Sequence, residues 1–193
     1  HGVVEYALGW GCWKTYLGRP ETDVSRRTAV RTLAIALSRN GDDETALAAF
    51  EAHLGAERRF FAANWEERSR DDDILTAEKQ ISHCYAHLGR HYEAITLRRS
   101  IYEKRLANHG PMDVNVLNDA MSLAFSLVSD YFFEEAKTFL RDIIPKSESV
   151  LGNQHHNTLA ARRLYAKAVY TDAHSSLDEQ REAIATLEDC RRI

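Results

Sequence analysis

Residues that interrupt regular structure are scarce in this sequence. It has only 3 prolines and 9 glycines among 193 residues, whereas the good helix formers Ala, Leu, Glu and Arg are plentiful. No apolar run approaches the ~18 residues that a membrane-spanning helix needs. These absences predict a chain that is helical almost throughout and is not inserted in a membrane.

Cysteines are also few, because Cys12, Cys84 and Cys190 lie far apart and are odd in number, which is not a disulfide framework. We expect reduced thiols, and therefore a cytoplasmic or another reducing intracellular compartment. The net charge of −4 is mild and argues against a dedicated nucleic-acid binder. Since the sequence begins at His1 and stops inside a helical pattern at Ile193, we expect a piece of a longer chain.

Motifs that carry chemistry are missing from the sequence. It has no phosphate-binding glycine loop, no Gly-x-Ser-x-Gly elbow and no calcium loop. The most metal-like group is His83, His87 and His91 with Cys84, since two histidines four residues apart share one helical face. However, no His-Glu-x-x-His motif is present, and His91 lies beyond a turn at Gly89. We expect no metal, no cofactor and no catalytic activity.

An internal repeat is the main positive signal. In four stretches an apolar residue precedes a small one, a turn follows seven residues after the small one, and a second helix has a small residue early in it. The second small residue follows the first by twelve positions in three stretches and by seventeen in the last. The stretches are Leu33-Ala34, Gly41, Ala46; Ile81-Ser82, Gly89, Ala94; Leu123-Ala124, Tyr131, Ala136; and Tyr165-Ala166, Ala173, Ala183.

The pattern has a physical reason in helix packing. Two antiparallel helices approach closely where small side chains meet, and a glycine supplies the left-handed conformation that ends the first helix. One such hairpin cannot bury its apolar face alone, whereas stacked hairpins can. We therefore predict an all-α solenoid with helices at 24–39, 43–64, 73–88, 91–108, 113–130, 132–151, 157–172 and 177–193.

Local signals mark several helix starts. Pro20 to Asp23 precede the first predicted helix, Asp71 to Asp73 begin the third, and Gly110 to Asp113 end one helix and cap the next. Asn157 or Thr158 is expected to cap the seventh. Among the remaining side chains we expect Trp10 and Trp13 in a core or interface, Trp65 packed or partly exposed, and a solvated face at Arg19, Arg26, Arg27 and Arg31.

Two segments resemble kinesin-light-chain-type tetratricopeptide repeats. They are Leu151 to Leu159, with its Leu-Gly, His and Thr-Leu, and the turn Gly89 to Ala94, with its Gly, Tyr and Glu-Ala. The resemblance covers roughly 24–193 and departs from the family at Tyr131, where glycine is expected. It implies a right-handed α-solenoid of about four repeats at 24–72, 73–112, 113–156 and 157–193. Residues 1–23 are then an N-terminal cap or a partial preceding repeat, and the resemblance also gives His155-His156 a packing or capping role.

The resemblance further implies a partner-binding groove lined by the first helix of each pair. In the shared register the groove also includes Thr28, Ile35, Thr76 and Val128. Its positions hold no acid, so we expect a protein or acidic peptide with hydrophobic anchors as partner, and neither nucleic acid nor membrane. The residues expected to bind the partner are Arg31, Lys79, His83, Asn118, Met121, Phe125, Arg163, Lys167 and Tyr170.

Two alternatives to peptide binding remain at this point. One is a purely architectural role, as a helical subunit or spacer in a large assembly. The other is the non-catalytic helical part of a larger multidomain protein.

Overall fold

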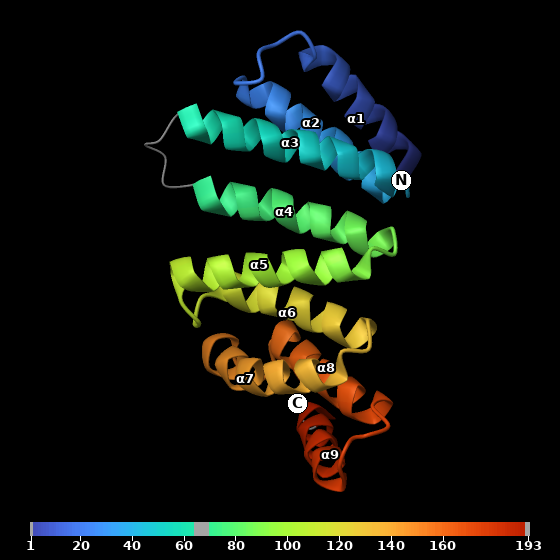
Figure 1. Ribbon diagram of the computed structural model, residues 1–193, viewed down its shortest axis with the longest axis vertical. Coiled ribbons are helices and arrows are strands. Elements are labelled where there is room, and N and C mark those ends of the chain that lie inside the picture. The colour runs from blue at the N-terminus through green and yellow to red at the C-terminus, as the bar shows by residue number, and fades with distance from the viewer. Residues whose placement is uncertain (1, 64–69, 192–193) are drawn as a thin grey trace. The chain divides into compact units, whose positions relative to one another are not determined.

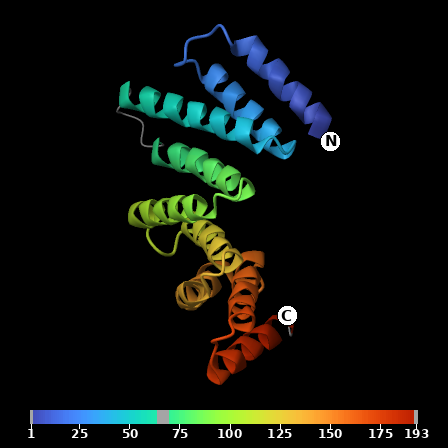
Figure 2. The same ribbon diagram turned by 45° about the vertical axis from the view of Figure 1, so that its right-hand side comes forward.

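The computed structural model describes residues 2–63 and 70–191, and these contain α-helices and no strand (Figures 1 and 2). The chain divides into two compact units, residues 1–97 and 98–193, and each is described by itself. The side chains of Trp65, Asp71 and Cys190 lie outside the described part, so the expectations about them stay untested. No helix in the described part is both long enough and apolar enough to cross a membrane.

The first unit is a row of packed helices. It contains α1 (Gly2–Tyr16), α2 (Val24–Arg39), α3 (Asp43–Ala63), α4 (Arg70–His87) and the beginning of α5 (His91–His109). Each of α2, α3 and α4 packs against the helix before it (Figure 1). Trp10 and Trp13 of α1 pack against the core, as expected, and that core includes Leu33, Leu37, Leu47, Phe50, Leu54, Ile81 and Cys84.

A glycine allows α1 to approach α2 closely. A Cβ atom added at Gly9 would lie 2.9 Å from the Cβ of Ala36 and 3.3 Å from the Cα of Leu33. Real Cβ atoms essentially never approach another atom as closely as 2.9 Å, so a larger residue at this position would push the two helices apart. Residues 2–16 form a regular helix docked on α2, and their assignment as an N-terminal cap or a partial preceding repeat stays a prediction.

The second unit contains the rest of α5 with α6 (Val114–Ser129), α7 (Phe133–Leu151), α8 (His156–Thr171) and α9 (Leu177–Arg191). Each of α7, α8 and α9 packs against the helix before it, and α8 also packs against α6. Large side chains with at most 1% exposure fill its core, namely Leu117, Leu123, Leu127, Leu140, Ile143 and Tyr165.

All eight predicted helices are present, with ends within three residues of the prediction. The small residues that defined the repeat are buried, among them Ala46, Ala94, Ala136 and Ala183, none more than 5% exposed. The spacing of small residues therefore identified the helix faces that pack. The repeat boundaries built on that spacing stay a prediction.

Helix caps agree with the sequence at two starts and differ at a third. The side chain of Asp23 accepts a hydrogen bond from the backbone N–H of Arg26, and that of Asp113 caps α6 in the same way. At α8 the expected cap, Asn157 or Thr158, is wrong. The Nδ1 atom of His155 accepts from the backbone N–H of Asn157 at 3.2 Å instead, and Thr158 is fully buried. The structural role expected for His155 is thus confirmed.

Three of the four predicted turns use a left-handed residue. Gly41 and Gly89 have φ of 82° and 73°, and Tyr131 takes the same conformation with φ of 66°. Tyr131 is the only non-glycine residue with positive φ in the described part of the chain. The fourth turn differs, because Ala173 has no positive φ and α8 ends at Thr171, followed by Asp172 in an extended conformation.

Buried ion pairs join helices within each unit. Arg27 Nε lies 3.0 Å from Glu57 Oε1, and both side chains are nearly inaccessible, so the expectation that Arg27 belongs to a solvated face is wrong. In the second unit Lys137 Nζ lies 2.8 Å from Asp172 Oδ2 and is 1% exposed. Such pairs need each partner, because a single buried charge is strongly destabilising.

Candidate partner-binding surfaces

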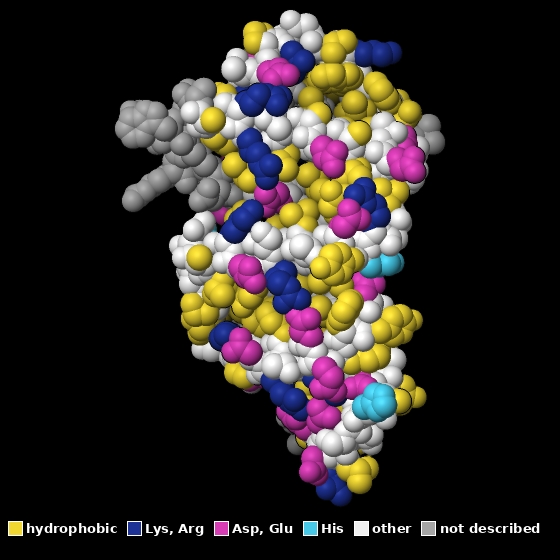
Figure 3. Space-filling model, in the orientation of Figure 1, with side chains coloured by type: hydrophobic (Ala, Val, Ile, Leu, Met, Phe, Trp, Pro, Cys, Tyr) yellow, Lys and Arg dark blue, Asp and Glu magenta, His cyan; other side chains and the backbone are white. Residues whose placement is uncertain are grey.

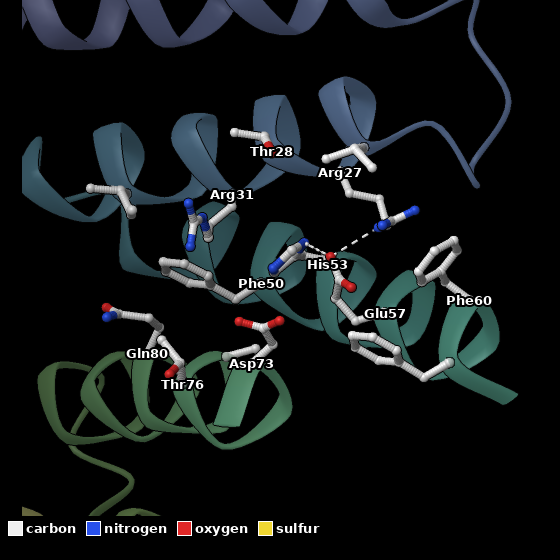
Figure 4. Close-up of a pocket in the computed structure, with 14 residues that line it drawn as sticks. Arg27, Thr28, Arg31, Phe50, His53, Glu57, Phe60, Asp73, Thr76 and Gln80 are labelled. Carbon is white, nitrogen blue, oxygen red and sulfur yellow. Dashed lines mark hydrogen bonds and ion pairs between the residues drawn. The ribbon is translucent and has the colours of Figure 1, made fainter. Parts of the chain in front are cut away.

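A cavity of about 330 Å³ lies between α2, α3 and α4 (Figure 4). We call it the α2–α4 cavity. It brings together four of the predicted groove positions, Thr28, Arg31 and Ile35 from α2 and Thr76 from α4. Phe50 of α3 also lines it. The first helices of two successive pairs thus form its sides, and the second helix of the first pair contributes its floor.

Charged side chains of both signs line the α2–α4 cavity. Besides Arg31 it contains Arg27, Glu57 and Asp73. The predicted groove positions included no acidic residue, so that prediction is incomplete for this cavity. The guanidinium of Arg27 lies 3.8 Å from the centre of the Phe60 ring as well as beside Glu57. Sequence reasoning missed Glu57 because it belongs to a second helix, and Asp73 because it was assigned only a capping role.

A buried histidine was also missed. His53 of α3 is 6% exposed and lines the α2–α4 cavity, and its Nδ1 atom has no hydrogen-bond partner. Burial lowers its pKa to about 4, and the positive charges of Arg31 and Arg27 act in the same direction. His53 is therefore neutral at pH 7. Nothing in the local sequence distinguishes it from a surface histidine.

The remaining predicted groove residues of the first unit lie on α4. Lys79 is half-buried and His83 is exposed, and neither is among the residues that line the α2–α4 cavity. The metal-like group around them is dispersed, because Cys84 is fully buried and His87 Nδ1 lies 3.2 Å from Asp43 Oδ1. Among the described residues no three His, Cys, Asp or Glu side chains form a group that could hold a metal ion.

A second cavity, of about 590 Å³, lies between α8 and α9 in the second unit. We call it the α8–α9 cavity. Three predicted groove residues line it together, Arg163, Lys167 and Tyr170, and α9 adds Ile184 and Leu187. Tyr170 is 90% exposed and Ile184 is 58% exposed. Apolar side chains this accessible, beside two basic residues, are typical of a surface that another molecule or helix covers.

The predicted groove residues of α6 have different environments. Phe125 is 56% exposed although most apolar side chains of this helix are buried. Met121 is half-buried, and the side-chain oxygen of Asn118 accepts a hydrogen bond from Asn157 of α8. Val128 is only 2% exposed, so its placement in a groove is wrong.

The surface charge is mixed on the face shown in Figure 3. Lys and Arg side chains alternate there with Asp and Glu side chains and do not gather in one patch. This face therefore carries no extended patch of one sign that would select a charged partner.

Comparison with known proteins shows the fold. No protein-family model and no curated protein sequence matches the chain. Two of the solved structures that match are of one protein from Podosopora anserina. That protein is assigned as a kinesin light chain with nearly identical TPR-like repeats. A point variant of that protein has a TM-score of 0.77 at 19% identity, over 97% of this chain and 84% of its own. The other structure has a TM-score of 0.72 at 17% identity, over 100% and 95%.

A third solved structure, BtubC (BKLC) from P. vanneervenii, has a TM-score of 0.74 at 15% identity and covers 100% of this chain and 74% of its own. The chain thus has the tetratricopeptide-like repeat fold seen in kinesin light chain structures, an all-α solenoid fold. This confirms the fold that the sequence resemblance implied. Because the residue identities are below 20%, this similarity shows the fold alone.

Proposed function

We propose that this chain is a protein-interaction scaffold that binds a peptide or a partner protein along the first helices of its helix pairs. The tetratricopeptide-like fold supports such a role. In residues 1–97 the proposed contacts are Arg31, Lys79 and His83. In residues 98–193 they are Asn118, Met121, Phe125, Arg163, Lys167 and Tyr170. No group suited to catalysis enters the proposal.

The exposure of aromatic side chains is the observation on which the proposal depends. Phe125 is 56% exposed and Tyr170 is 90% exposed, each on a helix whose other face is buried in the core. More than half of each side chain is therefore left in contact with solvent. Aromatic side chains are enriched at the centres of protein interfaces, because they bury a large area at a small cost in conformational entropy.

Charges and aromatic anchors should serve a partner in different ways. Arg163 and Lys167 are exposed beside the α8–α9 cavity, and an exposed ion pair contributes only roughly 0.2–1 kcal/mol to affinity. Their main effect is to speed the encounter with an acidic partner, which makes association sensitive to salt. Burial of the exposed half of Phe125 is worth about 1–1.5 kcal/mol, half of the value for a full side chain.

The test begins with selection of binding peptides from a displayed library on the purified chain. Association and dissociation rates of a selected peptide are then measured for Phe125→Ala and for the double variant Arg163→Glu, Lys167→Glu. We expect Phe125→Ala to speed dissociation about five- to tenfold. The double variant should slow association and reduce its salt dependence.

Two control variants match these changes. Tyr92→Ala removes an aromatic side chain that is 78% exposed at the start of α5, and Arg181→Glu reverses an exposed charge on α9. Neither should alter the binding rates. Peptides that bind the Phe125 and double variants as well as the unchanged chain would contradict the proposal and favour the architectural role.

A further inference from the structure

The α8–α9 cavity differs from the α2–α4 cavity in its size and in its lining. Its volume of about 590 Å³ lies within the roughly 300–1,000 Å³ that is usual for small-molecule sites. Its buried lining residues, Ala166, Val169 and Ala183, are all apolar and form its floor. No acidic side chain is among the residues that line it. The second unit therefore contains an apolar space of small-molecule size.

The two walls of this cavity differ in character. The α9 wall is apolar, because Ile184 and Leu187 line the cavity and are 58% and 42% exposed. The α8 wall is basic, because Arg163 and Lys167 line the cavity four positions apart on one helical face. A molecule in the cavity thus meets hydrocarbon on one side and positive charge on the other.

The two basic side chains of the α8 wall lack counter-charges. Arg163 and Lys167 are exposed and have no hydrogen-bond or ion-pair partner among the described residues. Other basic residues of this unit, such as Arg141 and Arg162, pair with carboxylates at 3.1 and 2.7 Å. Like charges four positions apart repel each other and destabilise a helix. One anionic group between them would remove this repulsion and form two ion pairs.

We propose that the α8–α9 cavity binds a small amphiphilic anion with the chemistry of a fatty acid. Its carboxylate lies between Arg163 and Lys167, and its hydrocarbon chain lies against the apolar α9 wall. This inference goes beyond the proposed function, because a free small molecule occupies the cavity and no peptide or protein is needed. An apolar helix in the same place would leave both basic residues without a counter-charge, and an inorganic anion would leave the α9 wall exposed.

The two parts of such a ligand contribute differently to affinity. Burial of one CH₂ group changes the dissociation constant about fourfold, so affinity should increase with chain length until the chain extends out of the cavity. An exposed ion pair contributes less, and Arg163 and Lys167 together should contribute about fivefold. Chain length should therefore affect affinity more than the loss of the two positive charges.

The experiment titrates the whole chain with dodecanoate below its micelle-forming concentration, by calorimetry and by NMR of the isoleucine and leucine methyl groups. We expect one dodecanoate per chain and shifts of the Ile184 and Leu187 methyl signals. Octanoate should bind at least about tenfold more weakly, because fewer CH₂ groups are buried. Dodecyltrimethylammonium has the same chain and the opposite charge, so it should also bind at least about tenfold more weakly.

Variants test the two walls separately. The double variant Arg163→Gln, Lys167→Gln should weaken dodecanoate binding about fivefold, whereas Arg181→Gln, which removes an exposed charge of α9 outside the cavity, should not. Ile184→Gln should also weaken it about fivefold, whereas Leu177→Gln, at an exposed apolar residue of the same helix outside the cavity, should not. All five side chains are exposed, so the variants should keep the fold, which circular dichroism checks.

Three results would overturn the inference. The first is saturable binding that leaves the Ile184 and Leu187 methyl signals unmoved, and the second is equal binding of dodecyltrimethylammonium. The third is a chain that binds no dodecanoate. In that case sedimentation as a dimer would assign the cavity to a second copy, and a selected peptide that moves the same methyl signals would assign it to a partner helix.

Failure of this inference is distinguishable from failure of the proposed function. Phe125 lies on α6 and does not line the α8–α9 cavity, so Phe125→Ala should leave dodecanoate binding unchanged. A chain that binds dodecanoate but selects no peptide overturns only the proposed function. A chain that selects a peptide sensitive to Phe125→Ala but binds no dodecanoate overturns only this inference.

Discussion

Tyr131 offers a direct test of the repeat register. It takes the left-handed conformation, with φ of 66°, at the position where the other turns have Gly41 and Gly89. This conformation costs an L-residue roughly 1–2 kcal/mol, and glycine avoids that cost. Two effects oppose a gain from Tyr131→Gly. Glycine increases the conformational entropy of the unfolded chain, which lowers stability by about 0.4–1 kcal/mol. The change also removes the edge-to-face contact with Phe133, whose ring centroid lies 5.8 Å from that of Tyr131.

The comparison of Tyr131→Gly with Tyr131→Ala isolates the energetic cost of the left-handed backbone conformation. Both changes remove the same ring, which is 76% exposed, but only glycine removes the strain. We expect the glycine variant to be more stable than the alanine variant by about 0.5–1 kcal/mol. That difference corresponds to about 1–4 °C in melting temperature for a chain of this size.

Thermal unfolding followed by circular dichroism measures this difference. Gly89→Ala is the reverse control, because it introduces a side chain at a left-handed position with φ of 73° and open space around it. It should lower the free energy of unfolding by a similar amount. An alanine variant at Tyr131 as stable as the glycine variant would show that the φ of this turn is not a source of strain and would refute the reasoning.

Three further changes test the packing and the charges. Ala136 is fully buried, so Ala136→Phe should overpack α6 against α7 and reduce the free energy of unfolding by about 1–3 kcal/mol in denaturant titrations; an unchanged midpoint would contradict the register. The Oγ1 atom of Thr158 is buried without a partner, so Thr158→Val should be neutral or stabilise by about 1 kcal/mol, and a clear loss of stability would point to a hidden partner. The hydrogen bond from Lys137 Nζ lowers the pKa of Asp172 to about 2. Since this lies below the ordinary aspartate pKa of 3.8, the stabilisation is present above about pH 4 and is lost as the pH falls from about 4 to about 2. Unfolding of Asp172→Asn should therefore depend less on pH in that window, and equal pH dependence of the two proteins would disprove the assignment.

The helices were predictable because the signals that define them are local. A small residue, a turn seven positions later and a second small residue lie within one helix hairpin, and Asp23 and Asp113 cap helices that begin at the next residue. Even the departure at Tyr131 kept the turn, because tertiary packing of α6 on α7 fixes its geometry despite the residue.

The features that sequence reasoning missed depend on partners far along the chain. Arg27 looked like a surface residue, but its carboxylate partner, Glu57, lies thirty positions away. Val128 looked accessible because the register of one helix does not reveal which of its faces other helices cover, and the side chain is 2% exposed. His53 became notable only when α2 and α4 enclosed it beside Arg31. Each depends on three-dimensional neighbours that no local pattern encodes.

The close contact at Gly9 also determines where α1 sits along its own axis. A shift of α1 by one helical turn would bring Glu5 or Trp13 to the place where Gly9 meets Ala36. A Cβ atom at that place would meet the Cβ of Ala36 at 2.9 Å, so either shift requires the two helices to move apart. The docking of α1 at its observed position is therefore favoured over a position one turn away. A residue that contributes no side chain thus helps to select the register of the first helix in the row.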